Sequence, residues 1–420
     1  MTVQPTVPPP STATVGIDDP DITLMVPVDD TTSPVLSIVI PALNEEITIE
    51  RFIDWCHEGI AQAGIEAEIL IVDSGSDRTA ELALAKGARV LKTPRRGLGR
   101  AYIDATPYAR GRFLILGDCD CTYDFRELRP FVDQFEAGKE FIMGSRFAGS
   151  IEAGSMPFLH RLGTPATTWI LNRVYSTKFS DIHCGMRGVT KDALLRMDIQ
   201  SQSWEYASEM IVKAVRLELD IAEIPVHFYK DPEGRFSHHK REGWMSPWKA
   251  AWINLRAMFV YGADFFLYRP GLVLLILGLV VTVPLAFGPV TVAGIELSLY
   301  WLLIGVTLAI VGLESFYLGC LTRVIYDHTG VKTARLLERF RYTRTTLIAM
   351  GIFGGGVLLV GSLAWRWVTN DFKLPGPLSA INYLAIFGLF LMVAGFTTFT
   401  FMLVLNALAD RMARRARTVL

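Results

Sequence analysis

The sequence predicts an α/β domain followed by an interfacial helix and four transmembrane α-helices. Three observations carry this prediction: the 51% apolar content of a 420-residue chain, the dense charges before residue 270, and the long uncharged stretches after it. With a mean hydropathy of +0.32, the chain is more apolar than a water-soluble enzyme of this length needs to be. Part of it is therefore expected to lie in lipid.

Charge and cysteine content narrow the class of protein. The net charge of -1 argues against a nucleic-acid-binding protein, because neutralising phosphates requires a strongly basic face. The cysteines show no CxxC spacing and no even disulfide framework, which fits a reducing compartment. They are Cys56, Cys119, Cys121, Cys184 and Cys320. We therefore expect the α/β domain to be cytoplasmic.

Residues 1–35 are predicted to be a disordered leader. They are rich in Pro, Thr, Ser and Asp and lack both the basic start and the apolar core of a signal peptide. A segment of this composition cannot bury enough apolar surface to offset the entropy of ordering. The first folded domain is expected to begin at residue 36.

Residues 36–235 show the alternation of an α/β domain. Short β-rich runs alternate with helical patterns, which predicts βαβ units. The predicted strands cover residues 36–40, 68–72, 89–91, 113–116 and 140–143. Polar and glycine-rich residues follow these runs, at the carboxyl edge where open α/β sheets bind ligands.

A pair of aspartates follows the fourth predicted strand. Asp118 and Asp120, separated by Cys119, come directly after the apolar run at 113–117. Two such carboxylates can point toward one cation, and Mg²⁺ or Mn²⁺ prefers oxygen ligands and can bridge a diphosphate. Acidic turns are common, so this triplet alone leaves both a metal site and an ordinary turn open.

Several further motifs occur in a fixed order along the domain. They are IVIPALNEE at 38–46, IVDSGS at 71–76, RGLG at 96–99 and DCD at 118–120. Together they resemble glycosyltransferase family 2, whose catalytic domain has the GT-A fold, a Rossmann-like architecture. The motifs GSRF at 144–147, HRLGT at 160–164 and DIHCGMR at 181–187 further resemble dolichol-phosphate mannose synthase and the bacterial polyprenyl-phosphate glycosyltransferases.

The resemblance implies an enzyme, an inverting glycosyltransferase. It would move a sugar from a nucleotide-diphosphate sugar to a polyprenyl (dolichyl-type) phosphate for later cell-envelope glycosylation, with a divalent metal (Mg²⁺ or Mn²⁺) as cofactor. Two alternatives remain open. One is a processive polysaccharide synthase, although its usual QxxRW motif is not found, and the other is a non-catalytic membrane-bound module that binds nucleotide-sugars.

The resemblance also assigns residues to roles. It implies a metal site at Asp118 and Asp120 and phosphate contacts from Arg146, Arg161 and Thr164. It implies a nucleotide pocket formed by Pro41, Leu43, Asn44, Glu45, Asp73, Gly97, Gly99 and Asp118. These roles are physically reasonable, since Asp73 can accept a base N–H, Gly97 and Gly99 let backbone approach the nucleotide, and Arg146 offers a bidentate fork.

The catalytic set implied in this way is Asp120, Arg146 and Asp124. A lipid phosphate is already ionised near pH 7, so it needs less help from a general base than a sugar hydroxyl. Asp124, Glu205 and Glu209 are the acidic candidates, and Glu209 is equally compatible with a structural role. Thr122 stands where mannose synthases tend to carry Gln, so the sugar is not predicted.

Residues 236–269 are expected to form a basic loop and an amphipathic interfacial helix. Arg235, directly before this segment, and Lys240 within it would contact the acceptor or donor phosphate, with attraction to anionic headgroups as the alternative. A helix starting at Ser246 and Pro247 would place apolar side chains on one stripe at the headgroup boundary. These side chains are Trp248, Trp252, Leu255 and Phe259.

Residues 270–409 are predicted to form the membrane domain. Uncharged stretches at 271–291, 298–320, 346–365 and 382–405, in which only Glu314 is charged, are long enough to cross about 30 Å of hydrocarbon. Basic residues gather between the second and third spans and in the tail at 410–420, which predicts that both are cytoplasmic. The protein is thus expected in the plasma (inner) membrane, with its catalytic domain and C-terminus in the cytoplasm. No nucleic-acid partner is expected, and the oligomeric state is not predicted.

Overall fold

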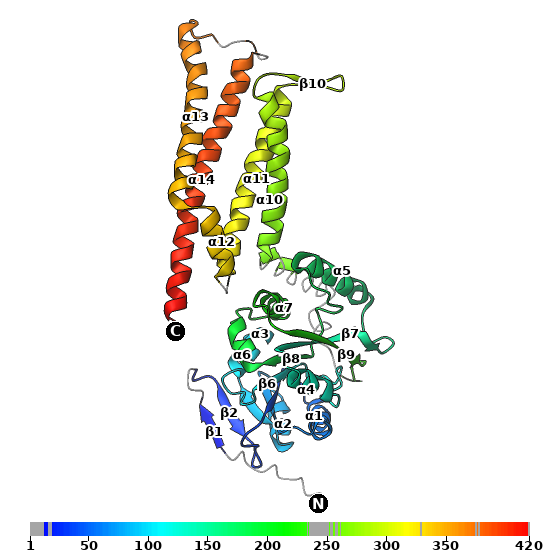
Figure 1. The fold of residues 1–420 in the computed structure, drawn as a ribbon. Coiled ribbons are helices and arrows are strands. Elements are labelled where there is room, and N and C mark those ends of the chain that lie inside the picture. Colours follow the sequence, from blue (N-terminus) through cyan, green and yellow to red (C-terminus); the bar gives the residue numbers. More distant parts are fainter. Residues whose placement is uncertain are drawn as a thin grey trace, which may run out of the picture. The chain divides into compact units, whose positions relative to one another are not determined.

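The structure, a computed structural model, contains two compact units, Met1–Val260 and Tyr261–Leu420 (Figure 1). Their positions relative to one another are not determined. The structure describes residues 12–15, 19–232, 234, 252, 255–256, 259–260, 262–327, 330–373, 376 and 379–418.

The first unit is built on a nine-stranded mixed sheet. Its strands are β1 (Thr12–Val15), β2 (Thr23–Val26), β3 (Leu36–Ala42), β4 (Ala67–Asp73), β5 (Arg89–Lys92), β6 (Phe113–Leu116), β7 (Phe141–Ile151), β8 (Arg187–Thr190) and β9 (Ile221–Phe228). All of the predicted strands are present. The sheet order is β1-β2-β5-β4-β3-β6-β8-β7-β9, and β5, β4, β3 and β6 are parallel neighbours.

Helices cover both faces of this sheet (Figure 1). They are α1 (Ile49–Ala63), α2 (Thr79–Ala85), α3 (Leu98–Ala105), α4 (Arg129–Glu136), α5 (Phe158–Tyr175), α6 (Lys191–Met197) and α7 (Tyr206–Arg216). Helix α1 contacts both α2 and α4, and α3 and α6 each contact α7. The crossovers of β3-α1-β4 and β4-α2-β5 run in the direction opposite to that of β5-α3-β6, which places α3 on the other face.

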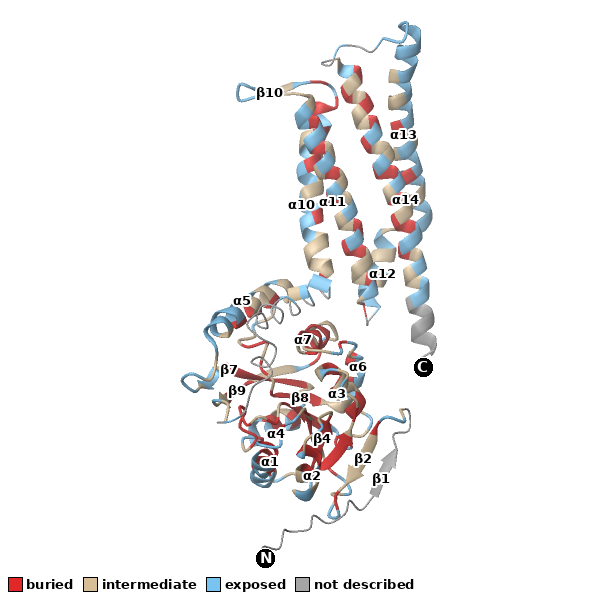
Figure 2. Cartoon of the chain, turned by 180° about the vertical axis from the view of Figure 1, so that it is seen from behind, coloured by how far each residue is buried: buried red, intermediate tan, exposed pale blue. Residues whose placement is uncertain are grey.

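The central strands are buried on both sides, because the helices on the two faces cover them (Figure 2). Every residue of β3 except Pro41 is buried, as are all four residues of β6. This explains why these strands read as continuous apolar runs rather than as alternating patterns. Their carboxyl ends therefore open onto one edge, where polar residues follow.

The prediction of a disordered leader is wrong for residues 19–35. Strand β2 pairs antiparallel with β5, with Leu24 opposite Leu91. Asp19 forms an ion pair with Arg96, and Asp30 receives two hydrogen bonds from Arg110, at 2.8 and 2.9 Å. A four-residue strand carries little signal of its own, since its stability comes from the open edge of β5 that it covers.

Among the residues that the structure describes, the second unit contains four helices that are long and apolar enough to cross a membrane, which confirms the predicted spans. These spans are Ala263–Leu285 (α10), Leu299–Ile325 (α11), Tyr342–Thr369 (α13) and Ala380–Arg411, which lies within α14 (Ala380–Thr418). A short helix, α12 (Val331–Arg339), joins α11 to α13.

The first span ends earlier than predicted. It stops at Leu285, and the apolar residues that follow form a hairpin of β10 (Val290–Val292) and β11 (Ile295–Leu297). The two turn residues, Ala293 and Gly294, have φ of 48° and 82°. Positive φ at both positions is the signature of the tight turn that joins antiparallel strands.

Glycines let the membrane helices approach closely. A Cβ on Gly312 of α11 would lie 2.2 Å from the backbone nitrogen of Leu275 in α10, and one on Gly356 of α13 would lie 2.5 Å from the carbonyl of Gly388 in α14. Small residues at such interfaces are typical of membrane helices, where close packing replaces the hydrophobic effect. Helices α10 and α11 thus form one closely packed pair, and α13 and α14 another.

Only part of the predicted interfacial helix falls within the described residues. Trp252, Leu255 and Phe259 are helical there, and Trp252 and Phe259 are exposed. Trp248 and the expected start at Ser246 and Pro247 lie outside the described residues, as do the side chains of the basic tail from residue 412 onward. The interfacial role of this helix stays a prediction.

Candidate active site

The two aspartates of the DxD motif follow β6 and are partly exposed, whereas the cysteines beside them are buried. Cys119 lies against the carbonyl of Pro41 at 3.6 Å, which brings the end of β3 next to the motif. Cys121 has a φ of 58°, in the left-handed region, so the chain turns sharply after Asp120. This alternation anchors the loop through the cysteines and leaves both carboxylates accessible.

Thr122 fixes the second aspartate. Its backbone N–H and its hydroxyl both donate to Oδ1 of Asp120, at 3.0 and 2.6 Å. A threonine two residues after an aspartate forms this local ring readily. Thr122 therefore orients one oxygen of the motif, a role that the sequence analysis did not assign to it.

A glycine lies against the first aspartate. A Cβ on Gly185 would lie 2.7 Å from Oδ2 of Asp118, so no larger residue fits there without a shift. The N–H of Gly185 donates to the hydroxyl of Tyr123 at 2.9 Å. The DIHCGMR segment thus packs directly against the DxD loop, although about 60 residues separate them in sequence.

Two buried tyrosines border the same loop. The hydroxyl of Tyr102 donates to the carbonyl of Gly117 at 3.0 Å, and its ring centroid lies 5.0 Å from that of Tyr206. Burial, and then the charge of Asp118, raise the pKa of Tyr206 to about 12. The pKa of Tyr102 is also raised, so both phenols stay neutral at physiological pH.

Asp124, an expected catalytic residue, is held by neighbouring side chains. Arg126 donates to both of its oxygens at 2.8 Å, and the hydroxyl of Tyr229 donates at 2.9 Å. Burial disfavours the charged carboxylate, but these hydrogen bonds outweigh it and lower the pKa of Asp124. A carboxylate so engaged is a weak base. Asp124 thus joins the DxD loop to the residue after β9, Tyr229. The backbone N–H of Tyr229 also donates to the carbonyl of Thr122 at 2.8 Å.

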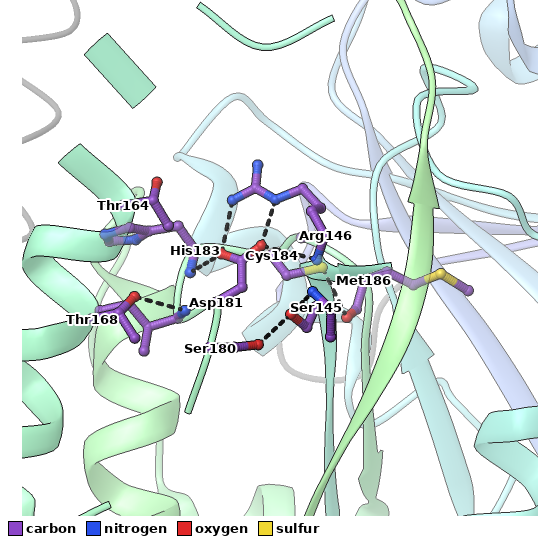
Figure 3. A network of polar contacts seen from close by, with 12 residues as sticks. Ser145, Arg146, Thr164, Thr168, Ser180, Asp181, His183, Cys184 and Met186 are labelled. Atoms are coloured by element: carbon purple, nitrogen blue, oxygen red, sulfur yellow. Dashed lines mark hydrogen bonds and ion pairs between the residues drawn. The ribbon is translucent and has the colours of Figure 1, made fainter. Parts of the chain in front are cut away.

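Arg146, which was expected to bind phosphate with its fork, uses that fork on Asp181 (Figure 3). Nε and Nη2 donate to the two carboxylate oxygens at 2.7 and 2.9 Å, and both side chains are buried. Burial opposes ionisation of Asp181, but the hydrogen bonds and charge of Arg146 lower its pKa. Arg146 thus anchors the DIHCGMR segment to β7, with two donors already committed.

In helix α5, Thr164 and Arg161 are three residues apart and differ in exposure. Thr164 is buried beside the segment that carries Asp181, whereas Arg161 is exposed. Farther along the helix, the hydroxyl of Thr167 lies 3.0 Å from Nε2 of His183. Burial, and then the positive charge of Arg146, lower the pKa of His183 to about 4 despite the opposing charge of Asp181, so its ring is neutral at pH 7.

The expected nucleotide residues gather at the carboxyl ends of β3 and β4. Asp73 is fully buried and accepts hydrogen bonds from the N–H of Gly75 at 2.8 Å and from Nζ of Lys92 at 2.5 Å. Asn44 has a φ of 57°, and its side chain accepts from the N–H of Ser76 at 2.9 Å. Lys92, which also donates to the carbonyl of Gly75 at 2.6 Å, was missed by the sequence analysis.

The remaining expected residues of this pocket differ in exposure. Pro41 and Leu43 are partly exposed, and Glu45 is buried. The backbone N–H of Glu45 donates to the hydroxyl of Thr79 at 2.9 Å, which ties the loop after β3 to the start of α2. These residues are thus held in place largely by hydrogen bonds within the protein.

The reason given for Gly97 and Gly99 needs correction. A Cβ on Gly97 would lie 2.3 Å from the carbonyl of Gln202, and one on Gly99 would lie 2.2 Å from the carbonyl of Ser201. In the structure these glycines make room for another loop of the protein. Glu209 holds that loop by accepting from the N–H groups of Gln200 and Ser201, at 3.0 and 2.8 Å, which assigns Glu209 the structural role.

The other expected phosphate ligands, Arg235 and Lys240, lie outside the described residues. Among the residues that are described, no group of three or more His, Cys, Asp and Glu side chains could hold a metal ion. Two carboxylates can nevertheless share a divalent cation whose other ligands are diphosphate oxygens and water. The partial exposure of Asp118 and Asp120, and the room that Gly185 leaves beside Asp118, fit such an ion.

Comparison with known proteins agrees with this geometry. Residues 37–197 match the family described as Glycosyl transferase family 2, and residues 320–409 match its C-terminal transmembrane region. The low-salt glycan biosynthesis hexosyltransferase Agl6 of Haloferax volcanii is 34% identical over 358 residues, which cover 83% of this chain and 84% of that protein. The chain belongs to glycosyltransferase family 2.

This family 2 glycosyltransferase has further relatives. The dolichyl-phosphate hexose transferase of Haloferax volcanii is 29% identical over 198 residues, which cover 46% of this chain and 82% of that protein. Among solved structures, the chain is similar to glucosyl-3-phosphoglycerate synthase from Mycobacterium tuberculosis in complex with Mn²⁺, UDP-glucose and phosphoglyceric acid. The match covers 55% of this chain and 80% of that one, with 20% sequence identity and a TM-score of 0.40.

The family 2 domain also contains site residues that no single motif revealed. Asp181 and Lys92 hold two of the expected residues, Arg146 and Asp73, and Thr122 holds Asp120. Asp181 stands in a motif quoted for the resemblance, but its partner lies 35 residues away in sequence. A motif indicates which residues matter together, and contacts of this kind become visible only in the fold.

Proposed function

We propose that this glycosyltransferase moves a sugar from a nucleoside-diphosphate sugar to a polyprenyl phosphate at a membrane surface. The observation that carries the proposal is a partly exposed pair of aspartates at the carboxyl edge of the sheet, in a chain with four helices able to span a membrane. The relative named dolichyl-phosphate hexose transferase supports a lipid phosphate as acceptor.

The aspartates would hold a divalent metal beside the leaving group. Asp118 and Asp120 would bind Mg²⁺ or Mn²⁺, which when bound neutralises the diphosphate as it departs. Thr122 keeps one oxygen of Asp120 oriented, and Gly185 keeps space beside Asp118. Preorganised ligands of this kind need no rearrangement when the donor arrives.

The donor nucleotide binds at the ends of β3 and β4. Pro41, Leu43, Asn44 and Glu45 line the pocket from one side, and Asp73 accepts a base N–H from the other. Lys92 and the N–H of Gly75 hold the Asp73 carboxylate in a fixed orientation. A carboxylate has about four acceptor positions, so a base N–H can add to these two bonds.

The reaction is a single displacement with inversion. An oxygen of the lipid phosphate forms the new bond to the anomeric carbon, and the bond from that carbon to the diphosphate oxygen breaks. The nucleophile is already an anion near pH 7, so no proton has to be removed. Asp124 therefore does not have to act as a base, and it can keep its hydrogen bonds with Arg126 and Tyr229.

The acceptor phosphate binds on the side of α5. Arg161 and Thr164 approach it from the helix, and Arg235 and Lys240 are expected to contact the same phosphate. Arg146 contributes positive charge from its anchored position against Asp181, rather than a free fork. The basic residues between the second and third spans and after the fourth support a cytoplasmic position for this domain, where nucleotide-sugars are made.

The test is transfer of labelled sugar by membranes that contain the protein. With UDP-, GDP- and dTDP-sugars and Mn²⁺, one donor is expected to give an acid-labile lipid product that organic solvent extracts. Asp120→Ala should abolish this product, whereas Asp192→Ala, which changes an exposed carboxylate on α6, should not. Label found only in a long polymer would instead establish a polysaccharide synthase, and absence of label with every donor would contradict the proposal.

A further inference from the structure

Residues 19–26 reach the carboxyl end of β5, at one side of the sheet (Figure 1). Strand β2 pairs antiparallel with β5 and has Thr23 opposite Lys92, so the residues before β2 run on past the last residue of β5. Ile22 is only 4% exposed, which shows that this segment packs into the domain. The segment precedes residue 37, where the family match begins.

Two carboxylates of this segment bind the arginine of the RGLG motif. Asp19 and Asp21 both form ion pairs with Arg96, the second at 3.4 Å. Asp19 is itself oriented, because its Oδ1 accepts from the N–H of Asp21 at 3.0 Å and its carbonyl accepts from the N–H of Ile22 at 3.2 Å. The hydrogen bond from Arg96 keeps the pKa of Asp19 below its usual range, so this pair is charged at neutral pH.

The loop that carries Arg96, residues 93–97, is joined at its start to the expected nucleotide pocket. The N–H of Thr93 donates to the carbonyl of Asp73 at 2.9 Å. Lys92, directly before the loop, donates to the Asp73 carboxylate at 2.5 Å. The loop itself is neither helix nor strand, and Arg96 lies near its far end. Asp19 and Asp21 thus supply an ionic contact to a segment that regular structure does not hold.

We infer that Asp19 and Asp21 are positioning residues of the donor site, because their hold on Arg96 orders the loop at 93–97. The ordered loop in turn keeps Asp73 in place for the nucleotide. This inference rests on the proposed function, since it takes the ends of β3 and β4 as the place where the donor nucleotide binds. Neither carboxylate touches the reacting atoms in this arrangement, so their effect falls on donor binding rather than on turnover.

The exposure of these ion pairs indicates that they contribute more to local order than to stability. The side chains of Asp19, Asp21 and Arg96 are 22%, 68% and 30% exposed. Ion pairs this open to water add little to the free energy of folding, because water screens the charges. A loop that is already ordered loses less conformational entropy when a ligand binds, so the contact raises affinity by preorganisation. Loss of the two carboxylates should therefore weaken donor binding and leave the fold intact.

The test compares a double variant, Asp19→Asn with Asp21→Asn, with the native full-length protein in lipid nanodiscs. Asp54→Asn is the matched control, because it removes another exposed ion pair, with Lys86 at 2.9 Å. Isothermal titration with UDP, GDP and dTDP, each with Mn²⁺, measures nucleotide binding. Hydrogen–deuterium exchange of residues 93–97 measures the order of the loop, and thermal unfolding shows whether each variant is folded.

In the double variant, the nucleotide that binds the native protein is expected to bind about tenfold more weakly. The amides of residues 93–97 should exchange faster, the unfolding midpoint should stay unchanged, and Asp54→Asn should alter none of these. Unchanged affinity or unchanged exchange in the double variant would overturn the inference. Tighter binding would overturn it as well, because Asp19 and Asp21 would then compete with the nucleotide for Arg96. Failure of all three nucleotides to bind the native protein would contradict the proposed function, and this inference with it, a result distinct from equal binding by native protein and variant.

Discussion

The two kinds of carboxylate at the candidate site differ in what they contact. Asp118 and Asp120 are partly exposed at the end of β6, whereas Asp73 and Asp181 are fully buried and each is bound by a basic side chain of another segment. The first kind can bind a ligand at little cost in free energy. The second kind keeps its charge only because a basic side chain matches it inside the fold, which fixes the orientation of the carboxylate.

Replacing an exposed aspartate should affect chemistry far more than folding. Asp118→Asn keeps the shape and removes the charge that would hold the metal, so we expect kcat to fall by roughly 10⁴-fold. The thermal unfolding midpoint should stay close to that of the native protein. Steady-state transfer assays and thermal scans in detergent measure both, and a large loss of stability would remove the distinction between the two kinds of carboxylate.

Replacing a buried aspartate should show the reverse order of effects. Asp181→Asn leaves Arg146 buried without its counter-charge, which costs about 3–5 kcal/mol of folding free energy. The unfolding midpoint should drop clearly, whereas Asp192→Asn at an exposed position should leave it unchanged. Arg146→Lys should not preserve the ion pair with Asp181, because an ammonium cannot make the two parallel hydrogen bonds of a guanidinium.

The histidine beside that pair predicts a pH dependence. The pKa of His183 is about 4 in the folded protein and about 6.5 when unfolded, so the unfolded chain binds a proton first as the pH falls. Its contribution to stability is complete above about pH 6.5 and is lost between there and about pH 4, by at most about 3 kcal/mol. His183→Gln should flatten this part of the stability curve, and His57→Gln, at an exposed site, should not.

The smallest effect is expected at Lys92. Lys92→Met removes one of the two bonds that orient Asp73, and its side chain is 39% exposed, so a loss of about tenfold in donor affinity is expected. Turnover at saturating donor should change little, because Lys92 does not reach the reacting atoms in the proposed arrangement. Isothermal titration with the nucleoside diphosphate and Mn²⁺ measures the change, and a fall in kcat alone would contradict the assigned role.

Much of the fold could be predicted because its signals are local. The central parallel strands β3 and β6 are mostly apolar, and the membrane helices are long enough to cross a bilayer, so composition identified both. Strand β2 could not be found in this way, since four residues in a Pro- and Asp-rich segment become a strand only by pairing with β5. The hairpin after α10 was missed because its valines also fit a longer membrane span.

The site was predictable to the extent that motifs mark it. The DxD aspartates and the residues after β3 lie where the motifs suggested, at one edge of the sheet. The contacts of the other site residues could not be assigned from sequence. Arg146 with Asp181 and Gly97 with Gln202 are contacts between segments that lie far apart in the chain. The sequence spacing of Arg146 was equally compatible with a fork open to phosphate, and only the fold shows that the fork is occupied.

The early strand β2 has a practical consequence for handling this protein. A chain shortened to begin at residue 36 would lose the segment that pairs with β5 and would present the unpaired backbone groups of that strand to water. Open strand edges of this kind join to one another between molecules. Such a shortened protein should therefore precipitate on concentration, even though everything removed resembles a dispensable tail.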